Sequence, residues 1–96
     1  MPFHVYILAS RPRGAIYVGT TRDLPTRMEQ HRLGTAGSHT RKYGITALVW
    51  FETHATAQDA NDRERRLKRW RRAWKDALIG KSNPAWRDLT DNLGYL

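Results

Sequence analysis

Four residues in the first third of the chain combine side-chain types and spacing that suit proton transfer and anion binding. Tyr6 and Tyr17 stand eleven positions apart, Arg27 follows ten residues later, and His31 comes four residues after Arg27. A phenol can exchange a proton, a guanidinium grips an anion with paired hydrogen bonds, and an imidazole changes charge near neutral pH. These side chains can act together only if the fold brings them to one place.

The two tyrosines lie in predicted strands joined by a tight connection. Residues 3–9 and 15–19 are rich in β-branched and aromatic types, and the segment 10–14 supplies Pro and Gly for a turn. A register in which paired positions sum to 23 would set Tyr6 directly opposite Tyr17, with aliphatic pairs on the other face. The tyrosines could also be a purely structural cross-strand pair, which stabilises a sheet by about 0.2–1 kcal/mol.

A helix is predicted over residues 24–33, with Asp23 as its N-cap and Gly34 directly after its end. Arg27 and His31 are four residues apart, so they share one face of this helix. Since a helix in this place borders the edge of the sheet, both side chains can reach a common site.

The middle of the chain is predicted to contain a basic loop and a third strand. Residues 34–44 are polar and punctuated by Gly, and we expect a mobile, phosphate-facing loop with one helical turn around 39–43. Residues 45–54 favour a strand that completes a small antiparallel sheet.

The longest predicted helix runs from residue 57 to about residue 79, after a capping-box sequence. Glu64 falls on or beside its apolar face, where a carboxylate needs a partner. That partner could be a divalent cation, or a cation of the chain itself such as Arg63, Lys68 or Arg27.

The charge of the chain indicates a polyanionic partner. Lys and Arg number 17 against 9 Asp and Glu, which gives a formal net charge of +8, and thirteen of the 17 are Arg, whose planar fork suits phosphate. Much of this charge lies on the outward face of the long helix, at Arg65, Arg66, Lys68, Arg69, Arg72 and Lys75. Such crowding favours nucleic-acid binding, although a run of like charges can also be a solvated face.

Composition also excludes several classes of protein. The chain has no cysteine, which rules out disulfides and thiolate metal sites, and no segment approaches the ~18 apolar residues of a membrane-spanning helix. The N-terminus lacks the pattern of a signal peptide, so a cytoplasmic location is expected. The tryptophans could stack on bases, but their apolar stripes favour core packing for Trp50 and Trp74.

These residues together resemble the GIY-YIG nuclease domain over nearly the whole chain. The resemblance rests on the hairpin VYILASRPRGAIYVG, on Arg27 and His31, on Glu64 within the helical sequence RERRLKRWRRAWK, and on Asn83 in NPAWRDL. It implies a single domain over residues 1–96 of α+β class, with a small three-stranded antiparallel sheet flanked by helices. It also implies a metal-dependent DNA endonuclease, structure-dependent or weakly sequence-specific. The chain departs from the family signature with Val5 for Gly, Val18 for Ile and Thr20 where relatives carry Lys.

The resemblance also assigns roles to individual residues. The implied catalytic residues are Tyr6, Tyr17, Arg27, His31 and Glu64. Glu64 would hold one Mg²⁺ or Mn²⁺, Arg27 would clamp the phosphate, and Tyr17 would act as general base once nearby cations acidify its phenol. Tyr6 would orient the water or the phosphate, and His31 would pass the proton to solvent. Nucleic-acid contacts are expected from Gly19, His39, Arg41, Lys42, Arg65, Arg66, Arg69 and Asn83.

Two other functions fit parts of the sequence. A non-catalytic DNA- or RNA-binding module would explain the basic helix without needing Glu64 or both tyrosines. A membrane-surface or protein-interaction adaptor would need only the charge. If the chain is an endonuclease, its selectivity is expected to come from a homodimer, a targeting partner protein, or the shape of branched or damaged DNA.

Overall fold

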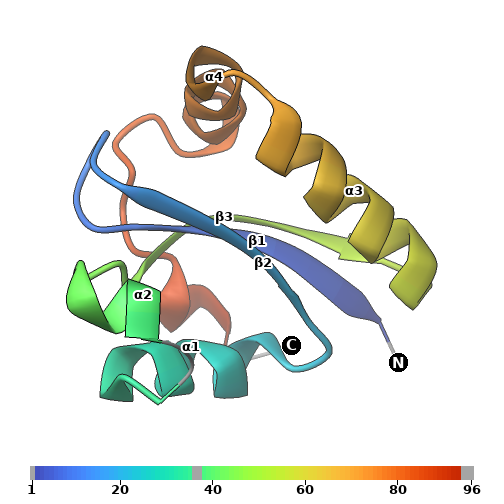
Figure 1. The fold of residues 1–96 in the computed structure, drawn as a ribbon, viewed down its shortest axis with the longest axis horizontal. Helices are drawn as coiled ribbons and strands as arrows, with labels where there is room; N and C mark the ends of the chain where they lie inside the picture. Colours follow the sequence, from blue (N-terminus) through green and yellow to red (C-terminus); the bar gives the residue numbers. More distant parts are fainter. Residues whose placement is uncertain (1, 36–37, 94–96) are drawn as a thin grey trace.

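The computed structural model describes residues 2–35 and 38–93. Its elements are β1 (Phe3–Ala9), β2 (Ile16–Thr21), α1 (Leu24–Leu33), α2 (Ser38–Lys42), β3 (Ala47–His54), α3 (Ala57–Arg69), α4 (Arg72–Ser82) and the short 3-10 helix η1 (Thr90–Leu93). The three strands form one antiparallel sheet in the order β2-β1-β3, with α3 and α4 over one face and α1, α2 and η1 over the other (Figure 1). The predicted α+β class and three-stranded sheet are confirmed.

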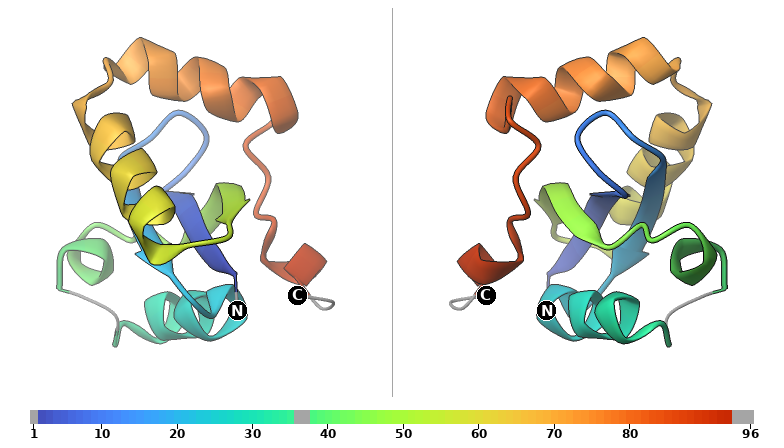
Figure 2. Two further views of the ribbon diagram at one scale, coloured as in Figure 1. Left: turned by 90° about the vertical axis from the view of Figure 1, so that its right-hand side faces the viewer. Right: turned by 90° about the vertical axis from the view of Figure 1, so that its left-hand side faces the viewer.

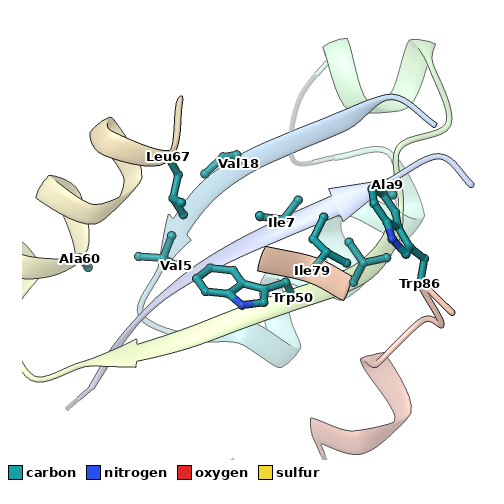
Figure 3. Packing of buried hydrophobic residues seen from close by; sticks show 10 residues of the cluster. Val5, Ile7, Ala9, Val18, Trp50, Ala60, Leu67, Ile79 and Trp86 are labelled. Carbon is teal, nitrogen blue, oxygen red and sulfur yellow. The ribbon is translucent and has the colours of Figure 1, made fainter. Parts of the chain in front are cut away.

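The central strand β1 is buried on both faces, so its side chains enter two separate cores. On one face Val5 and Ile7 pack with Leu67 of α3 and Ile79 of α4 (Figure 3). On the other face Tyr6, Leu8, Leu24, Met28, Ile45, Leu48 and Leu93 form the second core. Side chains alternate along a strand, so Tyr6 lies on the α1 side while its neighbours Val5 and Ile7 face α3.

The hairpin register differs from the predicted one by two residues. Tyr6 lies opposite Gly19, and Tyr17 lies opposite Leu8. The predicted direct pairing of the tyrosines is therefore wrong. A shift of two residues leaves every side chain on its predicted face, however, and both phenols still point to the α1 side of the sheet.

The connection between β1 and β2 explains this shift. The predicted register would have left a two-residue turn with Pro12 in its second position, and such turns favour Gly or Asn at positive φ rather than Arg followed by Pro. The observed loop spans Arg11–Gly14, with Arg13 at a φ of 59°. It is closed by the Ser10 N–H, which donates to the Ala15 carbonyl at 2.9 Å.

The predicted long helix is in fact two helices. α3 ends at Arg69 and α4 begins at Arg72, and the two residues between them are extended, with ψ of 148° and 149°. An unbroken helix over 57–79 would be about 34 Å long, whereas the longest dimension of the molecule is 31 Å. The bend lets α4 fold back over the sheet, where Ile79 is buried.

Of the two tryptophans predicted to lie in the core, Trp50 and Trp74, only one is buried. Trp50 is buried, as predicted, and Trp86 of the C-terminal segment is buried with it. Trp74 is 54% exposed. Its predicted core position is wrong because α4 does not continue the apolar stripe of α3.

Candidate active site

A buried hydrogen-bonded chain connects the sheet with both short helices on its α1 side. The Tyr6 hydroxyl is 3.1 Å from Nε2 of His31, and Nδ1 of the same ring is 3.1 Å from the Thr40 hydroxyl of α2. All three residues are buried. Alternation along β1 points Tyr6 at α1, and His31 meets it from the inward side of that helix.

Burial determines the protonation states of the Tyr6 and His31 side chains in this hydrogen-bonded series. Burial raises the pKa of Tyr6 to about 12, and the neighbouring Tyr17 adds to the rise while Arg27 opposes it. Burial, followed by the Arg27 charge, lowers the pKa of His31. At neutral pH the phenol keeps its proton and the imidazole is uncharged. A neutral imidazole has one donor and one acceptor nitrogen. The two hydrogen bonds that join Tyr6, His31 and Thr40 therefore run in the same direction, and such a series can pass a proton.

Tyr17 lies beside this chain and is half-buried. Its ring centroid is 6.3 Å from that of Tyr6 and 5.7 Å from that of His31. Tyr17 is therefore the phenol of this cluster that solvent and substrate can reach more easily.

Gly19 makes room for the two phenols. A Cβ placed on Gly19 would lie 2.6 Å from the Tyr6 hydroxyl oxygen and 2.9 Å from a ring carbon of Tyr17. The predicted role of Gly19, to let a phosphate approach the backbone, does not fit this face, because the tyrosine rings already occupy the space. Its missing side chain instead allows the rings to pack over β2.

A groove beside the edge strand β2 joins α1 to α3. It has a volume of about 300 Å³ and is lined by Phe3, Thr20, Thr21, Arg22, Arg27, Ala57, Ala60 and Asn61. Arg27 therefore stands where a ligand in the groove would meet the phenol cluster. Thr20, one of the departures from the family signature, is part of this lining.

Glu64 follows Asn61 by one helical turn on α3, and its side chain is 20% exposed. Its negative charge is the smallest of the contributions that raise the pKa of Tyr6. Its ion-pair partner is Lys68, with 3.6 Å between Nζ and Oε2. Arg63, another predicted partner, pairs with Glu52 of β3 instead.

The surroundings of Glu64 fit one hard divalent cation. Lys68 is 51% exposed and its pair with Glu64 is long, so this contact contributes little and can be displaced. Within 2–35 and 38–93, no group of three or more His, Asp or Glu side chains gathers around a point. A hard divalent ion that keeps most of its water ligands can bind through a single carboxylate, so Glu64 is the residue that could hold one.

The structure does not bring Asn83 into the cluster. Asn83 is buried, and its amide donates to the carbonyls of Val49 and Arg87 while its oxygen accepts from the Arg87 N–H. Val49 is the extra residue where the pairing of β3 with β1 shifts, so the amide satisfies a carbonyl at this irregularity. The predicted nucleic-acid contact by Asn83 is therefore wrong, since its polar atoms hold the C-terminal segment against β3.

The other predicted nucleic-acid residues lie on the surface. The side chains of His39, Arg41 and Lys42 are exposed on α2, the helix that carries Thr40 into the cluster, and Arg65, Arg66 and Arg69 are exposed on α3. Sequence reasoning missed Thr40 and Asn61. Thr40 carried no signal, because nothing in a polar loop marks which hydroxyl will be buried.

Fold and candidate residues together define a class of small α+β domain with tyrosines on two adjacent strands, an arginine on the following helix and a carboxylate on a later helix. A model of the GIY-YIG catalytic domain matches residues 2–77, and the chain belongs to the GIY-YIG family.

Several relatives are similar to this chain over most of their length. The chain is 33% identical over 76 residues to a UPF0213 protein of Bacillus pumilus, covering 79% of this chain and 78% of the relative. It is 34% identical to a UPF0213 protein of Xanthomonas axonopodis pv. citri, covering 93% of both chains. The solution NMR structure of a UPF0213 protein from Bacillus halodurans is similar with a TM-score of 0.57 and 27% identity, over 95% of this chain and 96% of that one. No helix in the described ranges is long and apolar enough to cross a membrane.

Proposed function

We propose that the protein is a divalent-metal-dependent endonuclease that hydrolyses phosphodiester bonds in DNA. One observation carries the proposal: Arg27 of α1 and Asn61 of α3 line the same groove, although the two helices cover opposite faces of the sheet. Glu64 follows Asn61 by one helical turn on α3. A guanidinium, a carboxylate and two phenols are the groups that phosphodiester hydrolysis requires, and of these Arg27 lines the groove itself.

Each side chain then has a distinct task. Arg27 binds the nonbridging oxygens of the scissile phosphate and offsets the charge that grows on them. Tyr17, the more accessible phenol, acts as general base in its phenolate form, after its own proton has passed to solvent. It takes the proton of the attacking water as the bond from phosphorus to the 3′ oxygen breaks, and the departing 3′ oxygen takes a proton from solvent. Tyr6 keeps its own proton, because its pKa is raised, and holds His31 in place. His31 is neutral, and because both its ring nitrogens are hydrogen-bonded it relays a proton towards solvent rather than keeping it. A divalent ion held by Glu64 would supply further charge stabilisation at the phosphate.

A plasmid-nicking assay tests the proposal. With Mg²⁺ or Mn²⁺, wild type should convert supercoiled plasmid to the nicked form, and Glu64→Gln and Tyr17→Phe should each lower the rate by about 100-fold or more while DNA binding persists. Glu29→Gln is the matched control, because Glu29 is an exposed carboxylate that pairs with Arg32 away from the groove. Wild type that binds DNA but cleaves it with neither ion would overturn the proposal. That result would favour the non-catalytic binding module, for which the exposed arginines of α3 suffice.

A further inference from the structure

The chain turns sharply where α3 passes into α4 (Figure 2). Trp74, in the first turn of α4, is an exposed tryptophan beside this corner. The ring of Trp74 meets that of Trp70 edge-on at 6.1 Å, and the guanidinium of Arg71 lies 5.7 Å from the Trp74 ring centroid. Even so, Trp74 is 54% exposed. An indole covered on both faces would show only its rim, so this ring is held in place and still offers a face to solvent. Trp70, Arg71 and Trp74 are called the Trp74 corner below.

The charge around the Trp74 corner suits a polyanion. Arg66, Arg69 and Arg71 are exposed, and within the described part of the chain no carboxylate lies within 4.0 Å of any of them. Arg65 and Arg72, by contrast, pair with Asp62 and Asp76. A free aromatic face among unneutralised arginines matches a ligand that carries both phosphates and flat rings, which is a nucleic acid.

The Trp74 corner and the groove lie on opposite flanks of α3. Arg63, whose guanidinium contacts the Trp70 ring at 5.2 Å, pairs with Glu52, so this flank faces β3. Asn61 lines the groove with Thr20 and Thr21, so the other flank faces β2. A strand that reaches both sites must cross the outer, arginine-rich surface of α3.

We infer that the Trp74 corner stacks a base of an unpaired DNA strand while a backbone phosphate of the duplex part of the same molecule lies in the groove. Bases inside a duplex are stacked on both faces and cannot offer one to Trp74, whereas a single-stranded tail or branch can. The inference rests on the proposed function and narrows its substrate to DNA in which duplex and unpaired strand meet.

Binding measured by fluorescence anisotropy in EDTA tests this inference without cleavage. The probes are a blunt duplex of about 20 base pairs and the same duplex with a thymidine tail of about 10 nucleotides, on either the 3′ or the 5′ end. Trp74→Ala should weaken binding of one tailed duplex by about 10-fold and of the blunt duplex by less than about 2-fold, because only the tail offers a base to stack. Trp74→Phe should retain most of the affinity. Leu33→Ala is the matched control, an equally exposed apolar residue on α1 that should leave both affinities unchanged.

Equal affinity of wild type and Trp74→Ala for both tailed duplexes would overturn the inference. A second outcome would also overturn it. If wild type sediments as a dimer, and Trp74→Ala makes it a monomer without changing the affinity for the tailed duplexes, the Trp74 corner is a protein interface. Plasmid nicking separates this inference from the proposed function. A wild type that binds tails through Trp74 but never nicks would refute only the nuclease, and nicking with tail binding indifferent to Trp74 would refute only the stacking site.

Discussion

The Tyr6 hydroxyl lies 3.1 Å from Nε2 of His31, and both residues are buried between β1 and α1. This contact gives the two tyrosines of the site different roles. The Tyr6 hydroxyl is buried and hydrogen-bonded to His31, and it keeps its proton because its pKa is raised. Tyr17 lies beside these residues and is half-exposed. The two phenols are therefore not interchangeable, although the sequence presents them as a pair.

Removing each hydroxyl should separate stability from activity. Tyr6→Phe leaves Nε2 of His31 buried without its partner, and should lower the free energy of unfolding by about 1–3 kcal/mol. Tyr17→Phe should change it by less than about 0.5 kcal/mol and yet abolish nicking. Urea denaturation and plasmid nicking on both variants provide the comparison. A large loss of stability in Tyr17→Phe with none in Tyr6→Phe would contradict the assignment.

Two glycine substitutions should have opposite effects. Gly19→Ala places a methyl group 2.6 Å from the Tyr6 hydroxyl oxygen, and displacing the rings should cost about 1–3 kcal/mol of stability as well as nicking activity. Gly80→Ala is its control, because a Cβ at Gly80 meets nothing within 4 Å and the residue lies in α4. There the helix-favouring alanine should add about 0.5–1 kcal/mol. Equal urea midpoints for the two variants would show that Tyr6 and Tyr17 move aside freely.

Stability should fall on mild acidification. Burial lowers the pKa of His31 below its ordinary value of 6.5, so the unfolded chain takes up a proton before the folded one does. The contribution is therefore present above about pH 6.5 and is lost as the pH drops from there towards the folded pKa of His31. His4, whose pKa burial also lowers, acts in the same direction.

Thermal unfolding between about pH 7.5 and pH 5.5 measures this effect. The change in Tm across that range should shrink in His31→Gln and shrink further in His31→Gln combined with His4→Gln. A wild-type Tm that is constant over the range, or that rises with acidification, would show that His31 is not buried as a neutral ring.

Local signals explain which parts of the fold could be predicted. The Asp23 carboxylate accepts from the Thr26 N–H at 3.2 Å, and Gly34 takes the left-handed conformation that ends α1, with a φ of 77°. Caps of this kind depend on neighbouring residues alone, so α1 was predicted with its exact limits. The face shared by Tyr6 and Tyr17 followed from strand alternation, which a shift of two residues does not change.

The features that could not be predicted depend on distant parts of the chain. No Pro or Gly marks the break after Arg69. The break occurs because the two helices must cover a small sheet, and a local sequence signal does not show the size of that sheet. Asn83 carries the same amide whether it meets a phosphate or the Val49 carbonyl, and only the packed C-terminal segment decides between them. Thr40 likewise becomes part of the site only because α2 folds onto α1.

Lys68 and Glu64 offer a test of how the carboxylate is shared between the chain and a cation. Their contact is 3.6 Å long and its lysine is 51% exposed, so it competes only weakly for the carboxylate. Lys68→Met should remove that competition and lower the Mg²⁺ concentration for half-maximal nicking by about 2- to 5-fold. Arg32→Met is the control, because it breaks the exposed pair with Glu29 on α1 and should leave the Mg²⁺ requirement unchanged. If Lys68→Met instead raised the Mg²⁺ requirement, Lys68 would assist phosphate binding rather than compete with the ion for the Glu64 carboxylate.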